Sequence, residues 1–195
     1  MICLLSAEIV NQSYCHVDDE SFSVRLLIKL RFTNVSDHRV ILAKLVESPL
    51  LVRAAKSGQD AEKGNLEYGP NVDYFPTELP ASPRFGEKPD VEHFIILAPH
   101  ESYEATVISG VVGAAVADKA REGSGLLAKG KHVLKFGVGT WPYQWPYFES
   151  RTDVQRLKKR WSRYGNLANG LVYSDFVVFT IPEEFDSPSC ETPSQ

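Results

Sequence analysis

The feature that most constrains the fold is the alternation of apolar and polar side chains in residues 22–34, FSVRLLIKLRFTN. Every even position from Phe22 to Phe32 is apolar, and every odd position except Leu27 is polar. Because successive side chains of a strand point to opposite faces, this period of two predicts a long strand with one buried face. Residues 34–37, NVSD, then predict a turn, and residues 38–46, HRVILAKLV, predict the returning strand of a hairpin.

Five further segments have the composition of short strands bounded by turn residues. They are 5–10, 91–99, 102–109, 131–141 and 171–181. A glycine precedes each of the last two, and Pro182 ends the last one because proline cannot donate to a strand ladder. Short strands that do not alternate regularly with helices predict a mainly β fold, an antiparallel β-sandwich.

Two long segments interrupt this strand pattern. We expect a single domain over residues 1–186, with insertions at 47–90 and 142–170, and a flexible polar tail at 187–195. The first insertion is rich in proline but also in tyrosine and phenylalanine, which favours a packed flap over a disordered linker. One short helix is predicted at 114–122 and a second inside the later insertion.

Three segments carry a resemblance to a known kind of domain: TNVSDHRVIL (33–42), LAPHESYEATV (97–107) and KGKHVLKFGV (129–138). Their order resembles bacterial immunoglobulin-like accessory domains and is loosely similar to the intracellular proteinase inhibitor family. The resemblance covers about half of the chain and skips both insertions. His100 stands where such domains usually have glycine. The resemblance implies an immunoglobulin-like β-sandwich with an accessory, non-catalytic role.

The second insertion begins within the aromatic segment TWPYQWPYF, residues 140–148. In an extended chain, side chains two residues apart share a face, so four rings would form one aromatic row: Trp141, Tyr143, Trp145 and Tyr147. Each following proline favours the extended conformation of the tryptophan before it. The parity of the preceding strand places this row on the outer face of the sheet, beside a trough left by Gly137 and Gly139. An aromatic row of this kind suits a sugar ring or a proline-rich peptide.

A basic amphipathic helix is predicted directly after the aromatic row, over residues 152–164. Thr152 is its expected N-cap and Gly165 its stop. The apolar stripe has helical spacing and consists of Val154, Leu157, Trp161 and Tyr164. The candidate partner-binding residues on the remaining face are Arg156, Lys159, Arg160 and Arg163. Three alternatives remain open: the helix covers the glycine trough and the row, a ligand occupies the row, or the helix binds a partner.

The distribution of charge argues against nucleic acid and membranes as partners. Residues 151–163 contain six Lys or Arg and one Asp, a net charge of +5, whereas the whole chain carries −4. The rest of the chain is therefore acidic, which opposes non-specific binding to polyanions. The segment MICLLSAEIV has neither the basic region of a signal peptide nor the length of a membrane span, so a cytoplasmic location is expected.

No catalytic, metal or nucleotide motif is recognisable. Residues 110–119 lack the spaced glycines of a dinucleotide site and the Gly-Lys-Ser/Thr of a P-loop. The five histidines are scattered, and His93 is expected to share a strand face with Ile95 and Leu97 at the edge of the core. The three cysteines allow at most one disulfide, a usage that suits a reducing compartment. We therefore expect neither an enzyme nor a cofactor or metal site.

The functional expectation is a binding or accessory module that recognises a protein or peptide partner. The alternative is a carbohydrate-binding β-sandwich that uses the aromatic row. A glycan array with the intact protein and a Trp145→Ala variant would separate the two interpretations, and the exposure of Trp141 and Trp145 would show whether the row is covered.

Overall fold

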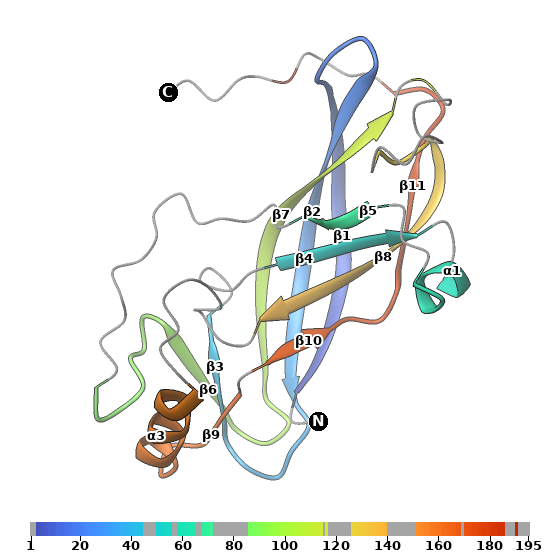
Figure 1. Ribbon diagram of the computed structural model, residues 1–195. Helices are drawn as coiled ribbons and strands as arrows, with labels where there is room; N and C mark the ends of the chain where they lie inside the picture. The colour runs from blue at the N-terminus through green and yellow to red at the C-terminus, as the bar shows by residue number, and fades with distance from the viewer. Residues whose placement is uncertain are drawn as a thin grey trace.

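A computed structural model describes residues 3–44, 50–55, 58–64, 68–71, 86–114, 116, 126–139, 151–168, 170–185 and 190. Over these residues the protein is mainly β, with its strands arranged in three sheets (Figure 1). The predicted fold class is thus confirmed at this level. The helix expected at 114–122 lies largely outside the described residues, and Ala114 itself ends a strand.

The first sheet contains the longest strands, β1 (Cys3–His16), β2 (Ser21–Asn34) and β7 (Ser102–Ala114), in the order β1-β2-β7. All pairs are antiparallel, with a bulge in β1 between Ile9 and Asn11. The alternation predicted for β2 is confirmed, because its even-numbered side chains from Phe22 to Phe32 are at most 3% exposed. The acidic turn before β2 is held by Asp18, whose carboxylate accepts hydrogen bonds from the backbone N–H of Glu20 and the hydroxyl of Ser21.

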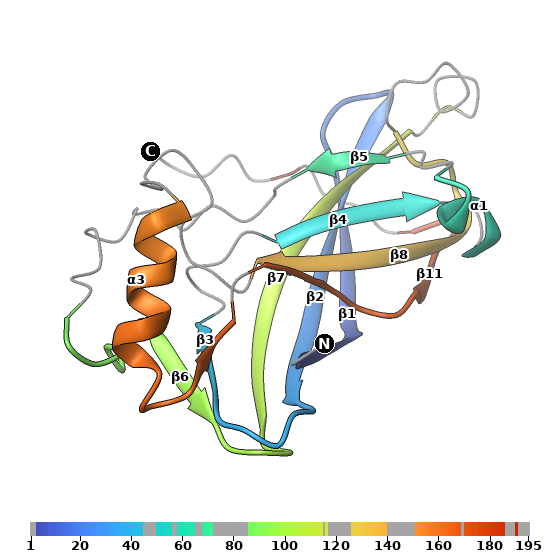
Figure 2. The ribbon, with the colours of Figure 1, turned by 60° about the horizontal axis from the view of Figure 1, so that its bottom comes forward.

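The second sheet crosses the first in both views (Figures 1 and 2). It contains β4 (Leu50–Ala55), β5 (Tyr68–Asn71), β8 (Gly130–Gly139), β10 (Leu171–Tyr173) and β11 (Val177–Ile181), with β8 pairing β4, β10 and β11. The strand expected over 171–181 is therefore two strands. The segment 47–90, expected to be a flap, supplies β4 and β5 as well as the short helix α1 (Gly58–Glu62), because its apolar run 50–55 pairs with β8.

The third sheet corrects the predicted hairpin. β3 (Val40–Ala43) does not return along β2; it pairs antiparallel with β6 (Phe94–Leu97) and parallel with β9 (Asn166–Leu167). The predicted turn at 34–37 is present, but it leads the chain away from β2, and β7 takes the place beside β2 that the returning strand was expected to fill.

One large apolar cluster joins the three sheets. Its central members are the inward side chains of β2, such as Leu26 and Ile28, together with Leu134 and Phe136 of β8 and Leu97 of β6, all completely buried. Burying a Leu, Ile or Phe side chain stabilises a fold by about 1.5–3 kcal/mol each. The two larger sheets are therefore held together chiefly by the apolar faces that alternation in β2 and β8 provides.

Helix α3 (Arg151–Trp161) packs on the third sheet, beside β3 and β6 (Figure 2). Its stripe residues Leu157 and Trp161 are buried against a small cluster, with Tyr164 at the margin: Ile41, Ala43, Phe94 and Leu167. Of the three alternatives, docking on the glycine trough does not describe Leu157 and Trp161, which pack on the third sheet instead. Thr152, the expected N-cap, lies within the helix. No described helix is long and apolar enough to cross a membrane.

A disulfide joins the tip of the β1–β2 hairpin to the C-terminal end of the described chain. Cys15, near the end of β1, is bonded to Cys190, with their Cα atoms 4.8 Å apart. The third cysteine, Cys3, is free and buried. Three cysteines allow at most one disulfide, and the structure contains it. Its two cysteines are 175 residues apart in the sequence.

Candidate functional site

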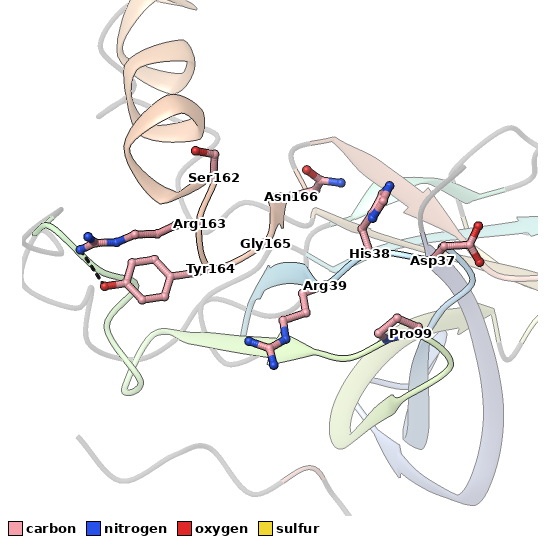
Figure 3. A pocket seen from close by; sticks show the side chains of 9 residues that line it. All are labelled: Asp37, His38, Arg39, Pro99, Ser162, Arg163, Tyr164, Gly165 and Asn166. Carbon is pink, nitrogen blue, oxygen red and sulfur yellow. Dashed lines mark hydrogen bonds between the residues drawn. The ribbon is translucent and has the colours of Figure 1, made fainter.

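A polar pocket of about 680 Å³ lies where the turn after β2 meets the chain that follows α3 (Figure 3). Three segments line it: 37–39, Pro99 and 162–166. Its side chains include two arginines, Arg39 and Arg163, and the aspartate Asp37. Because the lining is polar and charged, this pocket differs from the mostly apolar pockets that hold drug-like ligands.

The side chain of Asn34 holds two of these segments in place. Asn34 is completely buried at the end of β2. Its amide Nδ2 lies 2.7 Å from the carbonyl oxygen of His38 and 3.0 Å from that of Ala98, and it also reaches Leu97 O at 3.2 Å. Its Oδ1 accepts hydrogen bonds from the backbone N–H and the hydroxyl of Ser36. One buried amide thus ties the turn at 36–38 to the turn that carries Pro99.

The third segment is attached to the first by backbone contact. The N–H of Asn166 donates to the carbonyl oxygen of Arg39 at 2.7 Å, and the N–H of Ala168 donates to Ile41 at 3.0 Å. Gly165 permits this approach: its φ is +158°, and a Cβ there would lie 2.8 Å from the Arg39 oxygen. The glycine predicted to stop the helix therefore also closes the pocket wall.

Helix α3 is fixed above this wall by Trp161. The indole is 1% exposed, meets the ring of Phe94 edge to face at 5.0 Å, and donates from Nε1 to the carbonyl oxygen of Gly86 at 3.0 Å. Because Ser162 and Arg163 follow directly, the anchor sets where they enter the pocket. The pocket is thus built from specific contacts on all three sides.

The electrostatics of the pocket are dominated by its arginines. Arg163 donates from Nη2 to the Tyr164 hydroxyl at 2.9 Å, and its guanidinium lies 4.8 Å from the Tyr164 ring centroid. No carboxylate of the described residues forms an ion pair with Arg39 or Arg163. A guanidinium with unused donors can bind a carboxylate through two parallel hydrogen bonds. Asp37, which also lines the pocket, repels any negative group of a ligand that binds close to it.

The four predicted partner-binding residues, Arg156, Lys159, Arg160 and Arg163, are all exposed, and Arg163 is the one that lines the pocket. Lys158, Lys159 and Arg160 lie in the last turn of α3, where cations also interact favourably with the helix C-terminus. These positive charges therefore stabilise the helix, whether or not they also contact a partner.

The aromatic row cannot be placed. Trp141, Tyr143, Trp145 and Tyr147 all lie outside the described residues. Carbohydrate binding and peptide binding by that row both remain predictions.

Sequence reasoning missed Arg39, His38 and Asn166. His38 and Arg39 lie between β2 and β3, and Asn166 begins the two-residue strand β9, so no periodicity distinguishes them from other polar residues. Two of the local signals were visible, the NVSD turn and Gly165. The sequence did not show that these two segments, more than a hundred residues apart, lie side by side in the folded protein.

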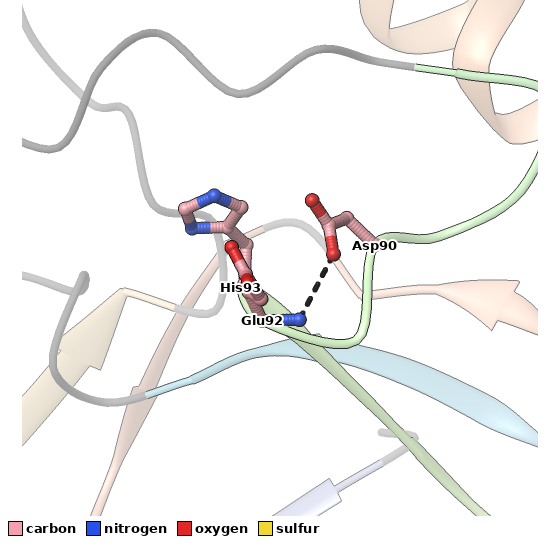
Figure 4. A group of neighbouring side chains, drawn as sticks. All are labelled: Asp90, Glu92 and His93. Carbon is pink, nitrogen blue, oxygen red and sulfur yellow. Dashed lines mark hydrogen bonds between the residues drawn. The ribbon is translucent and has the colours of Figure 1, made fainter.

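One group of side chains has the composition of metal ligands: Asp90, Glu92 and His93, whose candidate ligand atoms lie within 4.8 Å of one another (Figure 4). Imidazole and carboxylate are ligands that zinc and manganese accept. The same residues also form a turn, since the carboxylate of Asp90 accepts a hydrogen bond from the N–H of Glu92 at 3.0 Å. The expectation that His93 lies on a strand was wrong, because β6 begins at Phe94.

Titratable groups elsewhere have structural roles. Hydrogen bonds from Lys29 and then Arg31 lower the pKa of Glu104 on the exposed face of the first sheet. Burial raises the pKa of the Cys3 thiol to about 11. Neither group lies at the pocket.

Comparison of the chain with family models, with curated proteins and with solved structures finds no match.

Proposed function

We propose that this protein is a non-catalytic binding module that recognises an acidic segment of a protein or peptide partner at the Arg39–Arg163 pocket. The observation that carries the proposal is that these two arginines line one pocket from separate segments and form no ion pair with a described carboxylate. Arginine is the side chain best suited to carboxylate recognition, because its planar fork matches the two oxygens.

Two further observations support a peptide as the ligand. Besides its cations, the pocket is lined by the side-chain amide of Asn166 and the imidazole of His38, and an amide suits the backbone of an extended chain. Lys159, exposed one helical turn before Arg163, adds a further positive charge on α3. Since the rest of the protein is acidic, attraction of a negative partner is confined to this region, which favours a defined site.

The test is a binding titration with fluorescent peptides of equal length rich in glutamate, glutamine or lysine. We expect the glutamate peptide to bind best and its affinity to fall with salt. The double variant Arg39→Ala, Arg163→Ala should lose at least about tenfold in affinity, the scale of one or two charge-assisted hydrogen bonds. Arg25→Ala, an exposed arginine of β2, is the matched control and should bind normally. Equal binding of the glutamate and glutamine peptides would overturn the proposal.

Asp37 provides an independent check on the sign of the charge effect. Replacing this rim carboxylate by its neutral amide, Asp37→Asn, should tighten binding of the glutamate peptide, because it removes a like charge. Weaker binding by this variant would instead indicate that Asp37 itself contacts the ligand and that the partner is not acidic.

The type of β fold and the cellular location are also part of this proposal. We propose an immunoglobulin-like β-sandwich related to accessory domains; antiparallel pairing in the two larger sheets and their shared core support it. A cytoplasmic location is also proposed, and the Cys15–Cys190 disulfide is the observation that counts against it, because structural disulfides are rare in reducing compartments. Carbohydrate binding by the aromatic row is the alternative function, tested by a glycan array with Trp145→Ala.

A further inference from the structure

The C-terminal part of the chain is fastened to the tip of the β1–β2 hairpin by one covalent bond and a few side-chain contacts. Cys190 is bonded to Cys15, and its backbone N–H donates to the carbonyl oxygen of His16 at 2.9 Å. In Figure 1 a short red segment of the C-terminal part of the chain lies beside the blue hairpin tip at the top of the molecule.

Phe185 forms the noncovalent part of this attachment. Its ring stacks on Tyr14 with centroids 4.3 Å apart and meets Phe22 edge to face at 5.0 Å. Lys129 lies 5.6 Å from the centroid of the same ring. Phe22 in turn lies over its strand partner Gly113, where a Cβ would overlap its ring. Tyr14 and Phe22, the aromatic seat on which Phe185 packs, therefore belong to the first sheet, and their positions do not depend on the disulfide.

We propose that Cys15–Cys190 is a redox-sensitive clasp: its reduction releases Phe185 from the hairpin tip and uncovers the ring of Tyr14. The bond is chemically accessible at the Cys190 side, which is half-buried, whereas Cys15 is buried. A dithiol reductant attacks one sulfur through its thiolate, forms a mixed disulfide, and is then oxidised to its own cyclic disulfide. The S–S bond of the protein breaks, and two cysteine thiols form.

The noncovalent contacts of the C-terminal segment are few, so the Cys15–Cys190 disulfide determines whether the segment stays attached to the hairpin. A disulfide that closes a loop of 175 residues mainly restricts the open chain, so its loss frees the C-terminal residues to leave. What then remains is the stack of Phe185 on Tyr14, its edge contact with Phe22, the nearby Lys129 with its hydrogen bond to the carbonyl oxygen of Glu183, and one backbone hydrogen bond. Phe22 is completely buried and Phe185 packs at the margin of the main core cluster, but each aromatic contact or hydrogen bond of this kind contributes only about 1 kcal/mol. The clasp lies at the Ser21 end of β2 and the pocket at its Asn34 end, so this inference is independent of the proposed function.

Chymotrypsin cleavage after Phe185 reports the state of the clasp. Samples are digested with and without a dithiol and then fully reduced, so that a cut is seen in the mass of the main chain. We expect cleavage at Phe185 to be at least about tenfold faster in the reduced protein. Cys15→Ser should be cleaved at the fast rate in both conditions, and Cys3→Ala should keep the redox dependence of the wild type.

A second variant tests the aromatic seat without altering a sulfur. Phe185→Leu keeps a chymotrypsin site and the disulfide but loses the ring stack, so reduction of its disulfide by the dithiol should be several times faster than in the wild type. Two results would each overturn the proposal: equal cleavage of the oxidised and reduced protein, or a peptide map under oxidising conditions without a Cys15–Cys190 linkage.

Discussion

The backbone of Gly165 lies so close to Arg39 that a Cβ on the glycine would stand 2.8 Å from the Arg39 carbonyl oxygen. The neighbouring N–H of Asn166 donates to that same oxygen at 2.7 Å. This contact joins the end of α3 to the start of β3 and forms one wall of the pocket. The contact requires that residue 165 has no Cβ, so a substitution at this glycine tests it.

Replacing Gly165 by alanine should destabilise the protein and distort the pocket. The added methyl group would push Arg39 away, and overpacking of this kind typically costs about 1–3 kcal/mol. Gly170→Ala is the matched control, because Gly170 has nearly the same φ, +157°, but no atom within 4 Å of its would-be Cβ. Chemical denaturation of both variants isolates the contact; equal losses of stability would show that backbone conformation alone matters.

Replacing Asn34 by alanine should lower the free energy of unfolding by about 2–4 kcal/mol, because buried carbonyl groups lose their donor. Asn34→Asp keeps the volume but removes the donor Nδ2, so it should be destabilised to a similar degree. Asn11→Ala, at an exposed position of β1, should change stability by less than about 0.5 kcal/mol. Urea denaturation provides the measurement, and a stable Asn34→Asp protein would contradict the hydrogen-bond argument.

Two substitutions of Trp161 should separate packing from hydrogen bonding. Trp161→Phe loses the bond from Nε1 to Gly86 and should cost about 1 kcal/mol. Trp161→Ala also leaves a cavity beside Phe94 and should cost about 3–5 kcal/mol. Lys159→Ala, on the exposed face of the same helix, is the control. Similar losses for the first two variants would mean that the ring itself contributes little to packing.

Glu104 should make stability depend on pH in the acidic range. Hydrogen bonds from Lys29, with its Nζ 2.9 Å away, and from Arg31 lower the pKa of this carboxylate in the folded protein. The contribution is complete above the ordinary pKa of 4.5 and is lost as the pH falls through the lower folded value. Because the site is exposed, the effect should be small and weakened by salt.

The matching variant is Glu104→Gln. The difference in unfolding free energy between wild type and variant should be present at about pH 7 and shrink towards zero as the pH falls through the folded pKa of Glu104, where the carboxyl becomes protonated in both the folded and the unfolded protein. A difference that grows on acidification would have the wrong sign for a carboxylate stabilised by cations.

Cys3 should resist alkylation in the folded protein. Burial holds its pKa at about 11, and the thiolate is the reactive form. Iodoacetamide at about pH 8 should label it only after denaturation. Native labelling at the rate of a free thiol, followed by mass spectrometry, would show that this end of β1 opens readily.

Local pattern in the sequence determined the strands that have one buried face, β2 above all, because alternation records directly which face is buried. The even positions of β2 from Phe22 to Phe32, the stripe residues Leu157 and Trp161, and the turn at Asn34 could all be predicted from the amino-acid sequence. Each depends on neighbours within a few residues.

Pairing between distant segments was decided by the tertiary structure alone. The turn at Asn34 looked like a hairpin, yet β3 joined β6 and β9, because the buried amide binds the 98–101 turn and Gly165 admits the chain that follows α3. The pocket follows from that pairing: Arg39 and Arg163 have no relation in sequence. Local periodicity specifies which face of an element is apolar, but complementarity of whole surfaces selects its partner, and that information is spread over the entire chain.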